Sequence, residues 1–145
     1  MVDITKFLQA FRTTSLLTLA ALVLEFILGM YAALFVEFPA SLVDGQAWGW
    51  SMKESPMIIA HMSVGTLLLV LALLALLLGF ISHSKAAISW SAAGLILITA
   101  AYLSGSIFLT KVTENTYSFT MALGFLGSLL SYGAAFYFTR PPLKA

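Results

Sequence analysis

Four long apolar runs account for most of this chain and decide what it can fold into. They cover residues 14–38, 56–81, 88–110 and 117–139. A helix needs ~20 apolar residues to cross ~30 Å of hydrocarbon, so each run is long enough to span a bilayer. Because 61% of the residues are hydrophobic and only 9% are charged, the chain has too little charge to cover a water-soluble surface. We therefore expect one all-α integral membrane domain over residues 1–145, in which four transmembrane helices form a bundle.

Local signals place the ends of these runs and the contacts between them. Ser55 followed by Pro56 is typical of a helix cap with proline in the first turn, and the prolines of "RPP" at 140–142 cannot continue a helix. The turns at 82–87 and 111–116 are short, so successive helices should pack as antiparallel neighbours. Small residues four positions apart predict the packing faces, because they let helix backbones approach. These pairs are Gly29/Ala33, Gly124/Ser128 and Gly127/Ser131.

The lysine and arginine residues orient the predicted bundle. Five of the seven fall on one side of the membrane and two fall on the other. The first group is Lys6, Arg12, Lys85, Arg140 and Lys144, and the second is Lys53 and Lys111. Under the positive-inside rule, this distribution places both termini in the cytoplasm of a multi-pass protein in the cell (plasma) membrane.

Two segments outside the runs have patterns of their own. Ahead of the first run, apolar residues recur at helical spacing beside two cations, which predicts a short amphipathic helix lying in the cytoplasmic interface. Those apolar residues are Ile4, Phe7, Leu8 and Phe11. The outer connection, residues 39–55, contains "DGQAWGW". We expect Trp48 and Trp50 to rest at the headgroup level and the connection to fold over the outer mouth of the bundle.

Charge and cysteine content exclude several classes of function. The formal net charge is +1 and the basic residues are scattered, so no nucleic-acid partner is expected. The chain has no cysteine, which excludes disulfides, thiolate metal sites and covalently attached c-type haem.

Glu25 is the only acidic residue near the middle of a run. A charged residue at the centre of a bilayer costs ~2.5–3.5 kcal/mol on insertion scales, so such a residue is a functional candidate. Glu25 can be interpreted as a carboxyl that relays protons or faces a ligand. The alternative is a neutral carboxylic acid that hydrogen-bonds across to a neighbouring helix, with Tyr102, Ser104 or Ser106 as its partner.

The two histidines of the chain, His61 and His83, lie near opposite ends of the second run. They are 22 residues apart, about 33 Å along a helix, so they cannot share a metal ion or a haem. His83 falls at the inner turn, where an ordinary interfacial histidine is expected. His61 is the better ligand candidate, because Met121 lies at a similar depth in the last run and histidine with methionine is an established axial pair for haem iron. A dimer in which two copies of His61 meet is a second route, and an interfacial histidine bonded to Glu54 or to a backbone carbonyl is the alternative.

Three stretches and one acidic residue are similar to those of a known family. They are "HMSVGTLLLVLALLAL", "ITAAYLSGSIFLT", the order of residue types in "YSFTMALGFLGSLLSY", and an acid ahead of the second run. Over residues 55–137 the chain resembles one four-helix half of heme A synthase, in which two facing histidines bind haem and the outer acid contributes to the chemistry. His61 matches the first ligand and Glu54 approximates the acid. The second ligand position falls near Ser118, and Met62 stands where arginine is common. The resemblance therefore implies binding of haem b or a related cofactor, without synthase activity.

These observations lead to three functional hypotheses. In the first, the protein is a small membrane haem protein of the b-cytochrome kind, which passes electrons from quinol to an acceptor or handles haem for an oxidase. His61 and Met121 would hold the iron, Lys53 and Lys111 would pair with the propionates, and Glu54 would lie beside the pocket.

The second hypothesis is a non-enzymatic accessory subunit of a larger respiratory or oxygenase complex, which fits the small size and the small-residue faces. The third is a carrier or channel whose path includes Glu25, which four such apolar spans would form only as a homo-oligomer. The lipid bilayer is the one partner common to all three, and the first hypothesis is the one we favour.

Overall fold

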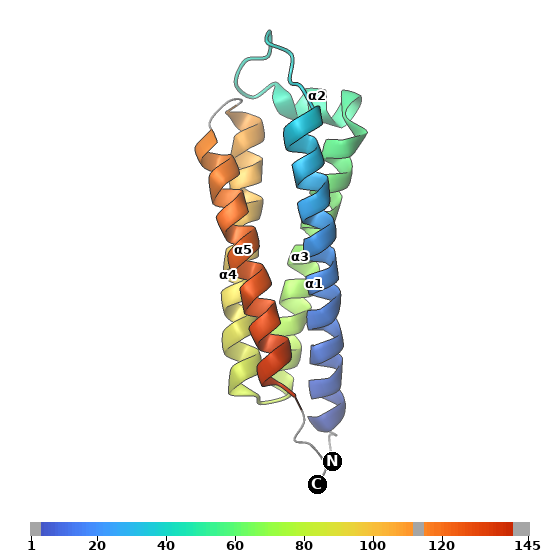
Figure 1. Cartoon of the computed structure of the whole chain (residues 1–145), viewed down its shortest axis with the longest axis vertical. Helices are drawn as coiled ribbons and strands as arrows, with labels where there is room; N and C mark the ends of the chain where they lie inside the picture. The colour runs from blue at the N-terminus through green and yellow to red at the C-terminus, as the bar shows by residue number, and fades with distance from the viewer. Residues whose placement is uncertain (1–3, 112–114, 141–145) are drawn as a thin grey trace.

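The computed structural model describes residues 4–111 and 115–140, and these residues form five helices (Figure 1). The helices are α1 (Ile4–Phe35), α2 (Ala47–Glu54), α3 (Pro56–Ile81), α4 (Lys85–Thr110) and α5 (Asn115–Phe138). The described chain is all-α, and α1, α3, α4 and α5 are each long and apolar enough to cross a membrane. The four expected long helices are therefore confirmed. Lys144 and the prolines at 141 and 142 lie outside the described residues.

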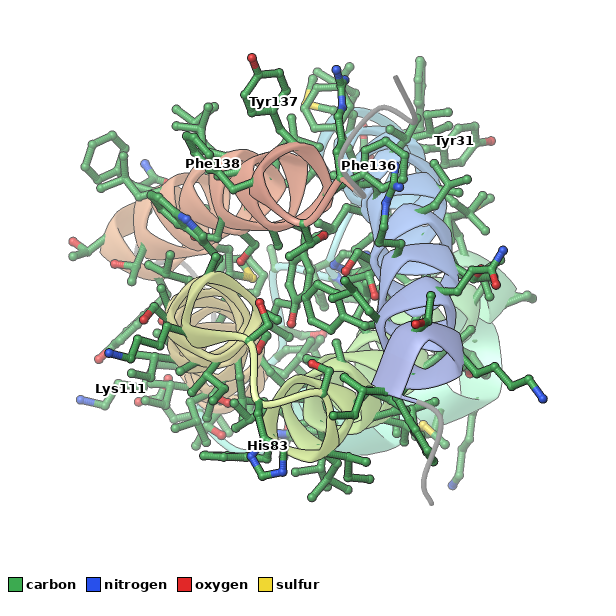
Figure 2. The ribbon with its side chains drawn as sticks, turned by 90° about the horizontal axis from the view of Figure 1, so that it is seen from below. Tyr31, His83, Lys111, Phe136, Tyr137 and Phe138 are labelled. Carbon is green, nitrogen blue, oxygen red and sulfur yellow. The ribbon has the colours of Figure 1, made fainter. Side chains whose placement is uncertain are left out.

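The four long helices stand around one axis in the order α1, α3, α4, α5 (Figure 2). Each packs against its two neighbours in that order, so α1 faces α4 diagonally and α3 faces α5 diagonally. The described chain begins with α1 and finishes after α5 at the same end of the bundle, which we call the terminal end (Figure 1). α2 lies at the opposite end, the α2 end.

α1 is one continuous helix of 32 residues. The expectation of a separate amphipathic helix ahead of the first span is therefore wrong. No proline or glycine interrupts residues 4–28, and the hydroxyls of Thr13, Ser15 and Thr18 donate to carbonyls four residues earlier in the same helix. Phe11 is fully buried in the bundle core instead of facing the interface. Burial of this ring draws the first turns of α1 into line with the rest of the helix.

α2 forms within the outer connection and packs against the ends of α3 and α4. The backbone N–H of Gly45 donates to the carbonyl of Thr110 at 2.8 Å, which ties the connection to the end of α4. Ala47 is fully buried, and the ring of Trp50 lies 5.2 Å from that of Phe38. The connection thus lies against the α2 end of the bundle, as the sequence predicted.

The main buried core occupies the terminal half of the bundle and contains many small residues. Its members are Phe11, Leu22, Leu68, Ala72, Ala75, Ala87, Ile98, Tyr132 and Ala135. The fully buried ring of Tyr132 lies directly on Gly94, where a Cβ atom would stand 2.5 Å from Tyr132 Cε2. No other residue fits at position 94 without displacing this ring, so the contact between α4 and α5 depends on glycine.

The small-residue pairs of α5 form its contact with α4, as predicted. A Cβ at Gly124 would stand 2.9 Å from Ala101 Cβ, and a Cβ at Gly127 would stand 2.8 Å from Leu97 Cδ1. Large apolar side chains instead face outward: Ile96 in α4 is 69% exposed. A surface of this kind is suited to lipid rather than to water.

Candidate functional site

An acid–imidazole pair links α1 and α3 in the half of the bundle nearer α2. His61 Nδ1 and Glu25 Oε1 lie 3.1 Å apart, and the side chains are 27% and 17% exposed respectively. His61 Nδ1 itself is buried, and the contact is an ion-pair approach rather than a well-aligned hydrogen bond. Glu25 Oε2 is also buried, and it has no hydrogen-bond partner among the described residues. Buried polar atoms without hydrogen bonds lower the stability of a membrane bundle and are typical of functional sites, so this pair is the centre of the candidate site.

Two glycines make room for the pair. A Cβ at Gly29 of α1 would stand 3.1 Å from His61 Cε1, and a Cβ at Gly65 of α3 would stand 3.0 Å from Glu25 Oε1. Each glycine follows one member of the pair by four residues on its own helix and faces the other member. The absence of side chains at these two positions lets the imidazole lie on α1 and the carboxylate lie on α3.

Glu25 and His61 contact each other and not the partners that the sequence predicts for them, among them Glu54 and Ser106. Glu54 is the last residue of α2 and is exposed, so it does not share a helix face with His61. The chain breaks between them because Ser55 caps α3 and Pro56 begins it. The hydroxyl of Ser106, an expected partner of Glu25, instead donates to the carbonyl of Tyr102 in its own helix.

A second polar contact between helices lies close to the pair. Tyr102 Oη of α4 is 3.5 Å from Thr66 Oγ1 of α3, and a ring carbon of Tyr102 would lie 3.7 Å from a Cβ at Gly65. Tyr102 and Glu25 therefore both approach Gly65. The other hydrogen bonds made by serine and threonine side chains of the described long helices run to the backbone of the same helix. Thr66 is therefore the described serine or threonine of these helices that contacts a polar side chain of another helix.

Met121, the second expected ligand, projects from α5, which lies diagonally across the bundle from α3. Its Sδ atom would be 3.1 Å from a Cβ at Gly105 of α4. The thioether therefore lies on α4 and the imidazole of His61 lies on α1, and the structure does not place the two donors as neighbours. Both donors nevertheless belong to the α2 half of the bundle, and each rests on a glycine of an adjacent helix.

The helices around this site lack the buried core of the terminal half. No residue of α1 after Leu22, of α3 between Ile58 and Leu68, or of α5 before Gly124 is fully buried. In α4, Ser104 is the one buried residue between Ile98 and Leu109. Most side chains at this level of the bundle are therefore partly or fully exposed.

The remaining predicted site residues lie at the surface. Lys53 is in the last turn of α2, and Lys111 follows α4 with its side chain directed away from the bundle (Figure 2). Both are exposed at the α2 end. His83 is exposed in the turn between α3 and α4, near the terminal end, where it adopts a positive φ of 52°. It takes no part in the His61 site.

The sequence indicates both Glu25 and His61 as candidate residues but does not predict that they contact each other. A signal was present, since Glu25 and His61 are each followed four residues later by a glycine. That pattern indicates two polar side chains exchanged across a close helix contact. The described residues hold no group of three or more histidine or acidic side chains that could bind a metal ion.

No family model, curated protein or solved structure matches this chain. The function of the chain must therefore be argued from its own residues, and the resemblance to heme A synthase stays a prediction based on short motifs.

Proposed function

We propose that this protein is a small multi-pass membrane protein that binds haem b in the α2 half of its bundle, with His61 as an axial ligand. The observation that carries the proposal is the 3.1 Å approach of Glu25 Oε1 to His61 Nδ1. A histidine that binds a metal commonly holds its other ring nitrogen against a carboxylate or a carbonyl. This second contact fixes the tautomer and the orientation of the ring. With Nδ1 held by Glu25, Nε2 is the nitrogen left to bind iron.

Met121 is the proposed opposite ligand. The donor chemistry fits, because imidazole and thioether are an accepted axial pair. The two donors come from α3 and α5, which face each other diagonally across the bundle, and they would hold the iron from opposite helices. The other two helices, α1 and α4, carry Gly29 and Gly105 against the two donors.

The polar residues at the α2 end supply the rest of the proposed site. Lys53 and Lys111 are cations at the end where propionates would emerge, and Glu54 lies beside Lys53 at the rim of the bundle. Haem, when bound, supplies one-electron transfer. The protein residues orient the imidazole, exclude water with α2 and neutralise the propionates. Quinol or a partner of the respiratory chain is the proposed source of electrons.

We propose that the α2 end faces outward and that both termini are cytoplasmic. The charge distribution supports this orientation, because most lysine and arginine residues lie at the terminal end. The cysteine-free chain makes the test direct. In intact cells, a membrane-impermeant maleimide should label Ser41→Cys and leave Lys85→Cys unlabelled. The reverse pattern would contradict the orientation.

The decisive experiment for the cofactor is the absorption spectrum of the purified protein after expression with added haem. We expect a Soret band that shifts on reduction and that disappears in His61→Ala. His83→Ala is the matched control, because it removes the other histidine, which lies in the turn after α3 near the terminal end, and should leave the band unchanged. Met121→Leu should retain haem but change the spectrum from that of a six-coordinate iron.

Glu25→Gln separates the role of the carboxylate from that of the ligand. We expect haem still to bind, with an affinity ~10–100-fold lower, as is usual when a group that orients a metal ligand is altered. The proposal is wrong if the unaltered protein binds no haem, or if His61→Ala and His83→Ala bind it equally. An accessory subunit that binds no cofactor would then be the better description.

A further inference from the structure

A second candidate site lies at the terminal end, far from His61. An open cavity of about 190 Å³ is present there between α1 and α5. It is lined by Gln9, Arg12, Thr13, Leu16 and Phe136. Phe136 lies on the side of α5 that faces α1 (Figure 2). The haem proposal uses none of these residues.

Arg12 is held in the cavity wall and is only partly exposed. Its guanidinium carbon lies 4.7 Å from the centroid of the Phe136 ring, a cation–π distance that fixes the plane of the group. The Nε atom is buried and has no hydrogen-bond partner among the described residues. A guanidinium suits an oxyanion, because two parallel N–H groups match the oxygens of a phosphate.

No acidic side chain neutralises Arg12 within residues 4–111 and 115–140. The described acids are Glu25, Glu37, Asp44 and Glu54, which lie in the half of the bundle nearer α2. Lys85 and Arg140 add positive charge at the terminal end, and the guanidinium of Arg140 is stacked on Tyr137 at 4.5 Å. Within the part of the chain that the structure describes, the cavity therefore presents positive charge that no acidic side chain offsets.

The other walls of the cavity point to an amphiphilic ligand. Leu16 is 53% exposed on the outer side of α1, and with the Phe136 ring it makes an apolar wall next to Arg12. Gln9 and Thr13 make the polar wall, about two turns and one turn before Leu16 in α1. A polar rim beside an apolar wall suits a headgroup followed by acyl chains, and a free inorganic ion would not use the apolar part.

We propose that this cavity binds the phosphate group of an anionic phospholipid, with Arg12 as the principal donor. Leu16 and Phe136 contact the first part of the acyl region. The site is independent of haem binding, because it lies at the opposite end of the bundle.

Native mass spectrometry of the full chain in mild detergent tests this assignment. Phosphatidylglycerol should bind and remain bound in the gas phase, while phosphatidylcholine should bind much less. Arg12→Gln should weaken phosphatidylglycerol binding by about ten-fold or more, the effect expected when charge-assisted hydrogen bonds are lost. Arg12→Lys keeps the charge but removes the planar fork, and it should lie between the two.

Lys85→Gln is the control, because it removes one exposed positive charge from the same end and lies outside the cavity. It should weaken binding by about five-fold or less, the effect of a general surface charge. Equal losses in Arg12→Gln and Lys85→Gln would overturn the site. Displacement of the lipid by millimolar inorganic phosphate would overturn the lipid assignment. Circular dichroism of each variant ensures that loss of binding is not loss of fold.

Discussion

The two halves of this bundle are built from similar apolar helices but are packed in different ways. The terminal half has a continuous core in which alanine, glycine and serine alternate with a few large rings, and Tyr132 is fully buried in it. The α2 half has almost no buried residue at the level of His61, and it carries the polar contacts between helices. The terminal half therefore supplies the closest packing between the helices, and the α2 half carries the polar pair between α1 and α3.

This difference follows from what apolar surfaces can do in lipid. Burial of an apolar side chain between helices gains little there, since lipid tails are equally apolar. Stability must come from close fit, which is achieved where Gly94 in the terminal half and Gly124 and Gly127 near the middle of α5 accept side chains from the neighbouring helix. In the other half, Gly29 and Gly65 accept an imidazole and a carboxylate instead.

The largest expected effect tests the close fit of the terminal half. Gly94→Ala places a Cβ 2.5 Å from the buried ring of Tyr132, which has no free space to enter. Overpacking costs ~3 kcal/mol and the better helix propensity of alanine returns ~1 kcal/mol, so we expect a loss of ~2 kcal/mol in the free energy of unfolding. Reversible unfolding by SDS in mixed micelles measures it.

Gly133→Ala is the matched control for this change. It lies in α5 in the same half, and a Cβ there meets nothing within 4 Å. We expect no loss, and a gain of up to ~1 kcal/mol. If both alanine variants behaved alike, the terminal half would not be closely packed at Gly94.

A smaller effect is expected at the acid–imidazole pair. Glu25→Leu puts an apolar side chain at position 25 and removes the close approach of the carboxylate to His61 Nδ1. Loss of a polar contact between membrane helices predicts a loss of ~1 kcal/mol in the free energy of unfolding by the same assay. Glu25→Gln retains a polar oxygen at the same place and should lose less. A Glu25→Leu variant as stable as the original would show that the pair contributes nothing to folding.

The contact between Thr66 and Tyr102 should contribute less still. At 3.5 Å it is long for a hydrogen bond, and interhelical bonds in membrane proteins average ~0.6 kcal/mol. Thr66→Val should therefore cost ~0.5 kcal/mol or less. Thr120→Val provides the baseline, because Thr120 also donates to the carbonyl four residues earlier and has no partner on another helix within the described chain. A cost above ~1 kcal/mol relative to that baseline would mean that this contact is a main support of the site.

The smallest effect is expected for Gly29→Ala. The new Cβ would stand 3.1 Å from His61 Cε1, but the ring is partly exposed and can turn away by a few tenths of an ångström. The gain in helix propensity offsets this contact, so the free energy of unfolding should change by ~0.5 kcal/mol or less. A loss as large as that of Gly94→Ala would remove the distinction between the two halves.

The long helices could be predicted from sequence because each depends on a local property, the length of an apolar run. Residues 56–81 were predicted within the limits that α3 has, since a serine cap and a proline mark its start. The sequence predicts a separate helix for the first residues of α1, because Phe11 belongs to an apolar face that suits the membrane interface. Its burial depends on α3, α4 and α5, and no local pattern records that.

The candidate site was predictable only in its parts. Glu25 and His61 stand out because polar residues are rare in such runs. Their pairing is a property of how α1 and α3 are aligned, which the intervening connection does not determine. The break at Ser55 also separates Glu54 from His61, so the two residues do not lie on one continuous helix.

The serine and threonine hydroxyls of the long helices have a mechanical consequence. Most of them bond to their own backbone, as Ser15, Ser91 and Ser128 do, so they do not fasten one helix to the next. Axial sliding of α1 along α3 in the α2 half is then resisted mainly at one latch, where Glu25 meets His61. Any event that engages the imidazole elsewhere would therefore remove the resistance that this contact gives to axial sliding of α1 along α3.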